Sequence, residues 1–176
     1  ALRTMTILVL GGRGKTASRL SLLLHNAGVP FLVGSSSTSY VGPYKMTHFD
    51  WLNEDTWTNV FLRASLDGID PISAVYLVGG HAPELVDPGI RFINVARAQG
   101  VNRFVLLSAS NIAKGTHSMG ILHAHLDSLE DVQYVVLRPT WFMGKFPKTT
   151  SCRRFAEPPP REPPGGSTCQ LDQKGG

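Results

Sequence analysis

A run of apolar residues ends directly at a glycine-rich loop near the start of the chain, and this junction limits the available folds. Thr6–Leu10 is almost continuously apolar, as expected of a strand that is buried on both faces. Three glycines follow in Gly11-Gly12-Arg13-Gly14, and residues 15–27 then have leucines at helical spacing before Gly28. The sequence therefore predicts a strand, a tight glycine turn and a helix in immediate succession.

The same alternation continues over about four-fifths of the chain. Further strands are expected at residues 31–33, 45–49, 74–78, 104–107 and 134–137, and further helices at 56–64, 88–99 and 119–129. A helix between two buried strands provides the crossover that a parallel strand pair requires. The pattern predicts an α/β fold, a Rossmann-like doubly wound parallel sheet of about six strands.

The sequence predicts the buried residues of two of these helices, and for one of them also the residue at which it begins. The buried stripe of the first helix is expected to hold Leu20, Leu23, Leu24 and Ala27. The helix before Gly100 is expected to begin at Asp87-Pro88, an N-cap followed by a first-turn proline. Its inward residues should be Phe92, Ile93 and Ala96.

The glycine loop has the spacing G-x-x-G-x-x-A, which is typical of a dinucleotide-binding turn. Gly11 permits the turn, Gly14 allows a pyrophosphate to approach the backbone, and Ala17 keeps the helix close to the sheet. Free N–H groups at the helix N-terminus and the helix dipole favour an anion there. Gly12, Arg13, Lys15 and Thr16 complete the candidate cofactor-binding loop. The alternative is a glycine turn without a ligand.

The second predicted strand ends in hydroxyl residues, where an NAD site usually has an acidic residue. Ser35, Ser36 and Ser37 follow Gly34, and hydroxyl groups can donate hydrogen bonds to a 2′-phosphate. Arg13 and Lys15 could add positive charge from the loop. NADP(H) is therefore favoured over NAD, although a simple turn cluster is the alternative interpretation of the serines.

More cofactor contacts are expected where other parallel strands end, because ligands of such sheets bind at the carboxyl edge. Asp50 and Trp51 follow the third strand, and Gly79 follows the fourth, both on the adenosine side. Ser108, Ser110 and Asn111 follow the fifth strand and would border the nicotinamide.

The character of the chain changes near Lys145. Residues 146–176 contain half of the chain's 12 prolines and no apolar period, so they are expected to be a disordered tail behind a Rossmann domain of residues 4–145. The net charge of +4 comes without a basic stripe, which argues against nucleic acid. No apolar run approaches a membrane span, and Cys152 and Cys169 cannot form a disulfide framework, so a cytoplasmic location is expected.

Catalytic and metal-binding groups are sparse. The Tyr-x-x-x-Lys pair of ordinary short-chain dehydrogenases is absent from the sequence, so no catalytic residue is assigned. His123 and His125 should point to different sides of a helix, which excludes a shared metal site. His117 and Lys114 are more typical of solvated surface groups than of a nicotinamide-facing histidine or a substitute catalytic lysine. Trp141 and Phe142 could line a pocket for a cationic substrate or pack in the core.

Four motifs occur in an order that resembles one known family. These motifs are Gly11 to Thr16, Phe49-Asp-Trp-Leu52, Leu106-Leu-Ser-Ala-Ser-Asn111 and Leu137-Arg-Pro-Thr-Trp-Phe-Met143. Together they are similar to the NmrA-like, atypical short-chain dehydrogenases, and among these to the fungal reductases of ergot alkaloid biosynthesis. The resemblance spans about residues 5–145.

The resemblance implies NADP(H) and a small-molecule alkaloid partner, an iminium intermediate derived from chanoclavine aldehyde. Members of this family continue into a second half with more sheet and much of the substrate pocket, whereas this chain turns into the proline-rich segment at Phe146. The resemblance therefore implies a C-terminus that is truncated or altered. A non-catalytic NADP-binding regulator, as some NmrA-like chains are, is the second hypothesis, and a truncated product without function is the third.

Overall fold

The computed structural model describes residues 5–12, 14–37, 43–79 and 83–140. The segment predicted to be disordered, 146–176, and both predicted domain boundaries lie outside this part of the chain. The described elements follow in the order β1 (Thr6–Leu10), α1 (Lys15–Asn26), β2 (Phe31–Ser35), β3 (Met46–His48), α2 (Asp55–Leu66), β4 (Ile72–Leu77), η1 (Pro83–Leu85), α3 (Val86–Ala98), β5 (Arg103–Leu107), α4 (Met119–Asp127) and β6 (Gln133–Leu137).

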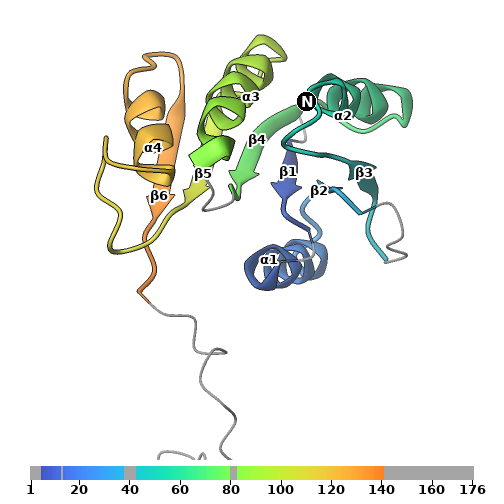
Figure 1. Ribbon diagram of the computed structural model, residues 1–176. Helices are drawn as coiled ribbons and strands as arrows, with labels where there is room; N and C mark the ends of the chain where they lie inside the picture. The colour runs from blue at the N-terminus through green and yellow to red at the C-terminus, as the bar shows by residue number, and fades with distance from the viewer. Residues whose placement is uncertain (1–4, 13, 38–42, 80–82, 141–176) are drawn as a thin grey trace, which may run out of the picture. The chain divides into compact units, whose positions relative to one another are not determined.

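The six strands form one sheet in the order β3-β2-β1-β4-β5-β6. Every pairing is parallel, as the alternation of strands and helices predicted. Helix α1 lies on one side of the sheet, and α2, α3 and α4 lie on the other (Figure 1). The predicted Rossmann-like fold is confirmed. Because the strand order reverses between β1 and β4, the carboxyl ends of these strands and the start of α1 border a crevice that is typical of ligand binding.

The buried face of α1 differs from the predicted stripe. Ala17 and Ser21 are buried, and Leu20 and Leu24 pack beside them, whereas Leu23 is 65% exposed. Residues 17, 20, 21 and 24 lie on one helix face, whereas Leu23 follows Leu20 by three residues but is six residues from Ala17 and two from Ser21, outside the centre of that face. The predicted end is correct, since Gly28 adopts a φ of 65° and its N–H bonds to the His25 carbonyl.

Strand β2 extends two residues beyond the prediction, which ended it before Gly34. Gly34 pairs with Leu10 on one side and Thr47 on the other, inside the ladder. A Cβ at Gly34 would lie 2.8 Å from Leu10 Cδ2 and 3.2 Å from Phe49 Cβ. The glycine is therefore required by tight packing within a strand, and it does not mark the end of that strand.

Helix α3 begins at Val86, so the prediction that Asp87 is its N-cap is wrong. The turn η1 leads directly into the helix, and Val86 is buried. Pro88 is then the third helical residue, a position where a missing N–H costs no intrahelical bond. Phe92, Ile93 and Ala96 are fully buried, as predicted. The remaining strands and helices begin and end within about two residues of their predicted bounds, as is usual for such boundaries.

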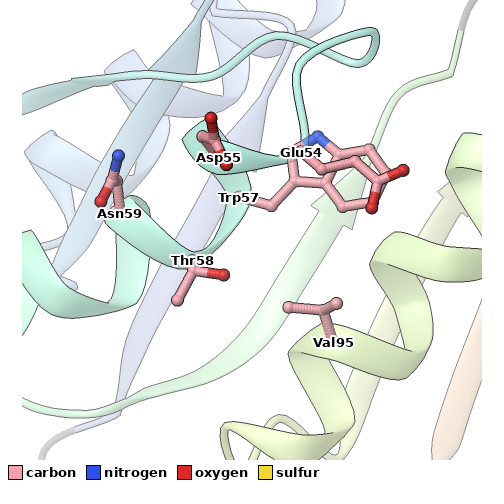
Figure 2. Close-up of a pocket in the computed structure, with 6 residues that line it drawn as sticks. All are labelled: Glu54, Asp55, Trp57, Thr58, Asn59 and Val95. Atoms are coloured by element: carbon pink, nitrogen blue, oxygen red, sulfur yellow. The ribbon is translucent and has the colours of Figure 1, made fainter.

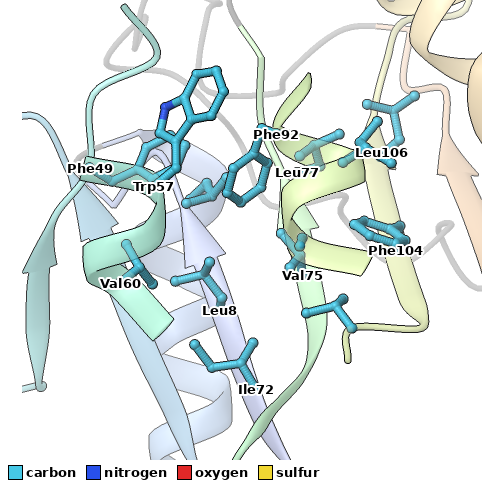
Figure 3. Packing of buried hydrophobic residues seen from close by; sticks show 14 of the residues in the cluster. Leu8, Phe49, Trp57, Val60, Ile72, Val75, Leu77, Phe92, Phe104 and Leu106 are labelled. Atoms are coloured by element: carbon cyan, nitrogen blue, oxygen red, sulfur yellow. The ribbon is translucent and has the colours of Figure 1, made fainter. Parts of the chain in front are cut away.

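The main core lies between the sheet and helices α2, α3 and α4, and Phe92 is at its aromatic centre (Figure 3). The Phe92 ring meets Phe49, Trp51 and Trp57 edge-on, with centroid distances of 5.0, 5.5 and 5.9 Å. Edge-to-face aromatic pairs contribute beyond the area that they bury. These contacts connect α3 and α2 to the residues directly after β3.

Replacing Phe92 by leucine should lower the free energy of unfolding by about 1.5 kcal/mol, because the edge contacts are lost while most of the apolar volume remains. Urea unfolding followed by circular dichroism measures this difference. Leu62→Ala is the control, since Leu62 on α2 is 54% exposed and should change stability much less. Equal losses in the two variants would contradict this description of the core.

The outer strand β6 has apolar residues on an open face. Tyr134 and Val136 pack against the main core, while Val135 and Leu137 are 56% and 42% exposed. This face of β6 therefore leaves apolar side chains open to solvent. Among the described residues, no helix is both long enough and apolar enough to cross a membrane.

Candidate functional site

A cavity of about 520 Å³ opens at the carboxyl ends of β1, β2 and β4. It brings together seven of the residues that the sequence assigned to a cofactor, namely Gly11, Gly14, Ser35, Ser36, Ser37, Asp50 and Gly79. Trp51, which the sequence pattern indicated together with Asp50 as an expected contact, also lines the cavity. The other lining residues are Gly34, Phe49, Leu52, Val78 and Leu85, which the sequence did not assign to the site.

The glycine loop is held in a tight turn by its own backbone. Gly11 has a φ of 70°, in the region that favours glycine, and its carbonyl accepts a hydrogen bond of 2.7 Å from the Gly14 N–H. The Gly12 N–H donates to the Gly34 carbonyl at 3.2 Å, which ties the loop to the end of β2. The N–H groups of Gly12 and Gly14 therefore shape the loop, and those available to a ligand come from the residues that follow.

The N-terminus of α1 is suited to a negatively charged group. Gly14 is the N-cap and supplies no side-chain cap, and the first turn holds no acidic residue. The first helical bond runs from the Ser18 N–H to the Gly14 carbonyl, so the N–H groups of Lys15, Thr16 and Ala17 have no acceptor within the helix. Unpaired N–H groups and the helix dipole favour an anion at this point.

The space beside this helix end depends on two glycines. A Cβ at Gly14 would lie 3.0 Å from the Gly11 carbonyl oxygen and would project from an exposed position on the cavity wall. A Cβ at Gly79 would lie 2.5 Å from Met119 Cε. The first glycine keeps the cavity open above the helix end, and the second allows α4 to approach the end of β4.

The serine cluster follows β2 and forms another wall of the cavity. Ser35 is 6% exposed, and its hydroxyl oxygen accepts a hydrogen bond of 3.2 Å from the Ser37 N–H. Ser36 is exposed on the cavity wall. The same serines thus form a local turn and line the cavity, so the two interpretations of the cluster are compatible. Arg13, the other predicted contact for a 2′-phosphate, lies outside the described residues.

Asp50 and Trp51 form the wall that follows β3. The Asp50 carbonyl accepts a hydrogen bond of 2.8 Å from Trp57 Nε1, and its carboxylate Oδ1 accepts one of 2.9 Å from the Leu52 N–H. The Trp51 ring meets Phe49 edge-on at 4.9 Å. The wall is therefore rigid and largely aromatic, a surface against which a flat ring can stack. Leu52 and Leu85 add apolar area whose position the sequence pattern could not predict.

Ser108, Ser110 and Asn111 follow β5 and do not line this cavity. Ser108 is buried, whereas Ser110 and Asn111 are exposed. The Ser108 N–H donates to the Leu137 carbonyl at 2.8 Å, and the Ser110 N–H donates to the Pro139 carbonyl at 3.0 Å. The segment after β5 is thus fixed to the segment after β6, at the same edge of the sheet as the glycine loop.

A second cavity of about 640 Å³ lies between α2 and α3 (Figure 2). Its walls come from Glu54, Asp55, Trp57, Thr58, Asn59 and Val95. Glu54 is paired with Arg91 of α3, and none of the predicted cofactor residues is present. This cavity has no feature that indicates a ligand.

The two histidines of α4 have structural partners. The His123 ring packs against Tyr134 at 5.8 Å, while His125 Nε2 lies 3.2 Å from Asn94 Oδ1, so the two histidines face different neighbours as predicted. His117 is exposed. Within the described ranges no cluster of histidine, cysteine or acidic residues could hold a metal ion. Trp141, Phe142, Cys152 and Cys169 lie beyond the described part of the chain.

Lys114 belongs to a surface cluster centred on Asp127. Its Nζ lies 2.7 Å from Asp127 Oδ2, and the Tyr134 hydroxyl donates to the same carboxylate. The hydrogen bonds from Lys114 and Tyr134 lower the pKa of Asp127 below its usual value. The cluster connects the loop after β5 to α4 and β6, which agrees with the prediction of a surface charge.

Folding lowers the pKa of Asp127, so its ionised carboxylate stabilises the folded chain at pH values above the usual aspartate pKa. This stabilisation is lost as the pH falls through the lower pKa that Asp127 has in the folded chain. We expect Asp127→Asn to be less stable than the parent at pH 7 and to approach the parent as the pH falls below about 4. Urea unfolding midpoints of both chains across this range test the expectation. A constant difference at every pH would contradict it.

The parallel sheet, its helices and the cavity at its carboxyl edge define a Rossmann-like domain. Solved structures with this fold include a nucleoside-diphosphate-sugar epimerase from Staphylococcus aureus, with a TM-score of 0.60 and 16% identity over 76% of this chain and 50% of that one. Yeast methylglyoxal/isovaleraldehyde reductase Gre2, solved with NADPH, has a TM-score of 0.57 and 16% identity over 76% and 53%. No family model matches the chain.

Sequence relatives are much more similar. The chain is 99% identical over 139 residues to festuclavine dehydrogenase of Aspergillus fumigatus, which covers 79% of this chain and 48% of that protein. It is 62% identical to festuclavine synthase I of Penicillium roqueforti over the same shares, and 50% identical to agroclavine dehydrogenase of Claviceps fusiformis over 81% and 48%. The matched part of the chain is therefore related to the festuclavine and agroclavine dehydrogenases, which confirms the predicted resemblance. The chain spans about half the length of these relatives.

Proposed function

We propose that the chain is the cofactor-binding part of an NADP(H)-dependent oxidoreductase that reduces an iminium intermediate of clavine alkaloid biosynthesis. The observation that carries this proposal is the single cavity shared by the glycine loop, the uncapped N-terminus of α1 and the serine cluster. The relatives named as festuclavine and agroclavine dehydrogenases support the class of substrate.

The residues present fit a dinucleotide. Gly11 and Gly14 leave room for a pyrophosphate, and the N–H groups of Lys15, Thr16 and Ala17 would donate to it. Asp50 and Trp51 would border the adenine, with Gly79 beside the ribose. A cavity that is apolar toward Leu52 and Leu85 and polar toward the serines matches the two ends of an adenosine group.

The choice of NADP(H) over NAD rests on the end of β2. An acidic side chain at that position would accept a hydrogen bond from a ribose 2′-hydroxyl and would repel a 2′-phosphate. Ser36 and Ser37 could donate to the phosphate, and exposed Lys15 would add positive charge from the first turn of α1. Arg13 would join them from the glycine loop.

Iminium reduction fits a chain to which no acid–base pair is assigned. When bound, NADPH would supply a hydride to the iminium carbon. As the new C–H bond would form, the π pair of the C=N bond would move to nitrogen as a lone pair, so the cation would become a neutral amine and no proton donor would be needed. Ser110 and Asn111 would border the reacting ring at the carboxyl edge, where they would orient it and exclude water.

A non-catalytic NADP-binding sensor is the second candidate. It is supported equally well by the same missing Tyr-x-x-x-Lys pair. A sensor would bind NADPH without consuming it when the iminium is supplied. Location in the cytoplasm remains part of the proposal for either candidate.

Oxidation of NADPH in the presence of an enzymatically generated clavine iminium separates the two candidates. We expect binding of NADPH together with slow oxidation that depends on the iminium and yields the reduced amine. NADPH binding with no oxidation above a reaction that lacks protein would support the sensor and contradict the reductase. Heat-denatured chain is the control for spontaneous reduction.

A further inference from the structure

Arg138 lies directly after β6 and reaches across to the segment that follows β5. Its Nη2 donates a hydrogen bond of 2.9 Å to the Ser110 carbonyl, and its Nε lies 3.4 Å from the Ala109 carbonyl. The guanidinium is exposed, so it is held there by these two carbonyls and not by burial. The sequence pattern predicted neither contact. It identified Arg138 only as a member of the motif that begins at Leu137.

The same two segments are also joined by their backbones. The Ser108 N–H donates to the Leu137 carbonyl, and the Ser110 N–H donates to the Pro139 carbonyl. The ladder between β5 and β6 is thus continued past the ends of both strands. A guanidinium is well suited to close such a junction, since its planar fork can address two neighbouring carbonyl groups at once.

The consequence concerns the two exposed side chains of this junction. With the carbonyls of Ala109 and Ser110 turned toward Arg138, the side chains of Ser110 and Asn111 remain exposed at the carboxyl edge. A segment of this kind would otherwise be free to change its backbone conformation, because exposed loops have low local stability.

We propose that Arg138 is a positioning residue that holds the segment after β5 so that Ser110 and Asn111 receive the nicotinamide half of the dinucleotide. This inference rests on the proposed function, because it assumes that the dinucleotide extends from the α1 cavity toward β5. Arg138 acts through the loop and does not touch the adenosine half. Its loss should therefore affect the two halves of the ligand differently.

The test compares two ligands, NADPH and adenosine 2′,5′-bisphosphate, which lacks the nicotinamide half. Arg138→Met should weaken NADPH binding about fivefold to tenfold, the value of one or two lost hydrogen bonds, and should leave the affinity for the bisphosphate unchanged. Arg138→Lys should restore part of the NADPH affinity. Amide hydrogen exchange without ligand should show faster exchange at Ser110 in Arg138→Met.

Arg103→Met is the matched control, because Arg103 links the same two strands at their other end through Nε and Gln133 Oε1 at 3.1 Å. It should change neither affinity. Equal weakening of both ligands by Arg138→Met, or unchanged binding and unchanged exchange, would overturn the positioning role alone. A parent chain that binds neither ligand would contradict the proposed function, and the role of Arg138 with it.

Discussion

Replacing Gly14 by valine should weaken NADPH binding by about 100-fold or more, because two or more hydrogen bonds to a charged group would be lost. The new side chain would meet the Gly11 carbonyl oxygen, from which even a Cβ is only 3.0 Å away, and would occupy the cavity above the N-terminus of α1. Gly14 has a φ of −72°, so valine brings no left-handed backbone strain there. The loss should therefore appear in binding more than in folding.

Gly28→Ala is the control at the other end of the same helix. Gly28 has a φ of 65°, and no atom lies within 4 Å of the point where its Cβ would stand, so alanine should cost about 1 kcal/mol of stability through backbone strain alone. Its NADPH affinity should equal that of the parent. Isothermal titration calorimetry gives both affinities, and parental affinity in Gly14→Val would exclude the glycine loop from the cofactor site.

Ser36→Asp should reverse much of the preference for NADPH. The new carboxylate would stand at the end of β2, where it would repel a 2′-phosphate and could accept a hydrogen bond from the 2′-hydroxyl of NADH. We expect the affinity for NADPH to fall roughly tenfold and the affinity for NADH to rise roughly tenfold. The ratio of the two affinities should therefore fall by about 100-fold. Parallel titrations with the two cofactors measure this ratio.

The control adds the same charge elsewhere. Asn102→Asp places one carboxylate at an exposed position before β5, at the opposite edge of the sheet, with almost no change in shape. It should leave the ratio unchanged. A shift of similar size in both variants would attribute the effect to net charge and would show that the serine cluster does not determine cofactor choice.

The order and direction of the strands could be predicted because they depend on local patterns. Apolar runs such as Thr6–Leu10 and Ile72–Leu77 alternate with amphipathic helices, and only a parallel sheet accommodates that alternation. The role of Gly34 was misjudged because it depends on partners far along the chain, since Leu10 and Phe49 leave no room for a side chain there. The start of α3 was placed one residue late because the burial of Val86 and the preceding turn η1 carry no local sequence signal.

The same distinction applies to the candidate site. The glycine loop and the strand-end residues Ser36 and Asp50 could be found because chain position alone places them at the carboxyl edge. Leu52, Leu85 and Arg138 could not, since a lone leucine or arginine in a loop carries no local signal of what it will meet. Only the tertiary arrangement shows that the two leucines border the cavity and that Arg138 joins two strand ends.

Titration of the purified chain with NADPH, NADH and ATP, with binding followed by nicotinamide fluorescence for the first two and by calorimetry for all three, tests the central claim most directly. We expect saturable binding of NADPH, much weaker binding of NADH, and no comparable binding of ATP. Equal affinity for the three nucleotides, or binding of none of them, would contradict the assignment of this cavity to NADP(H).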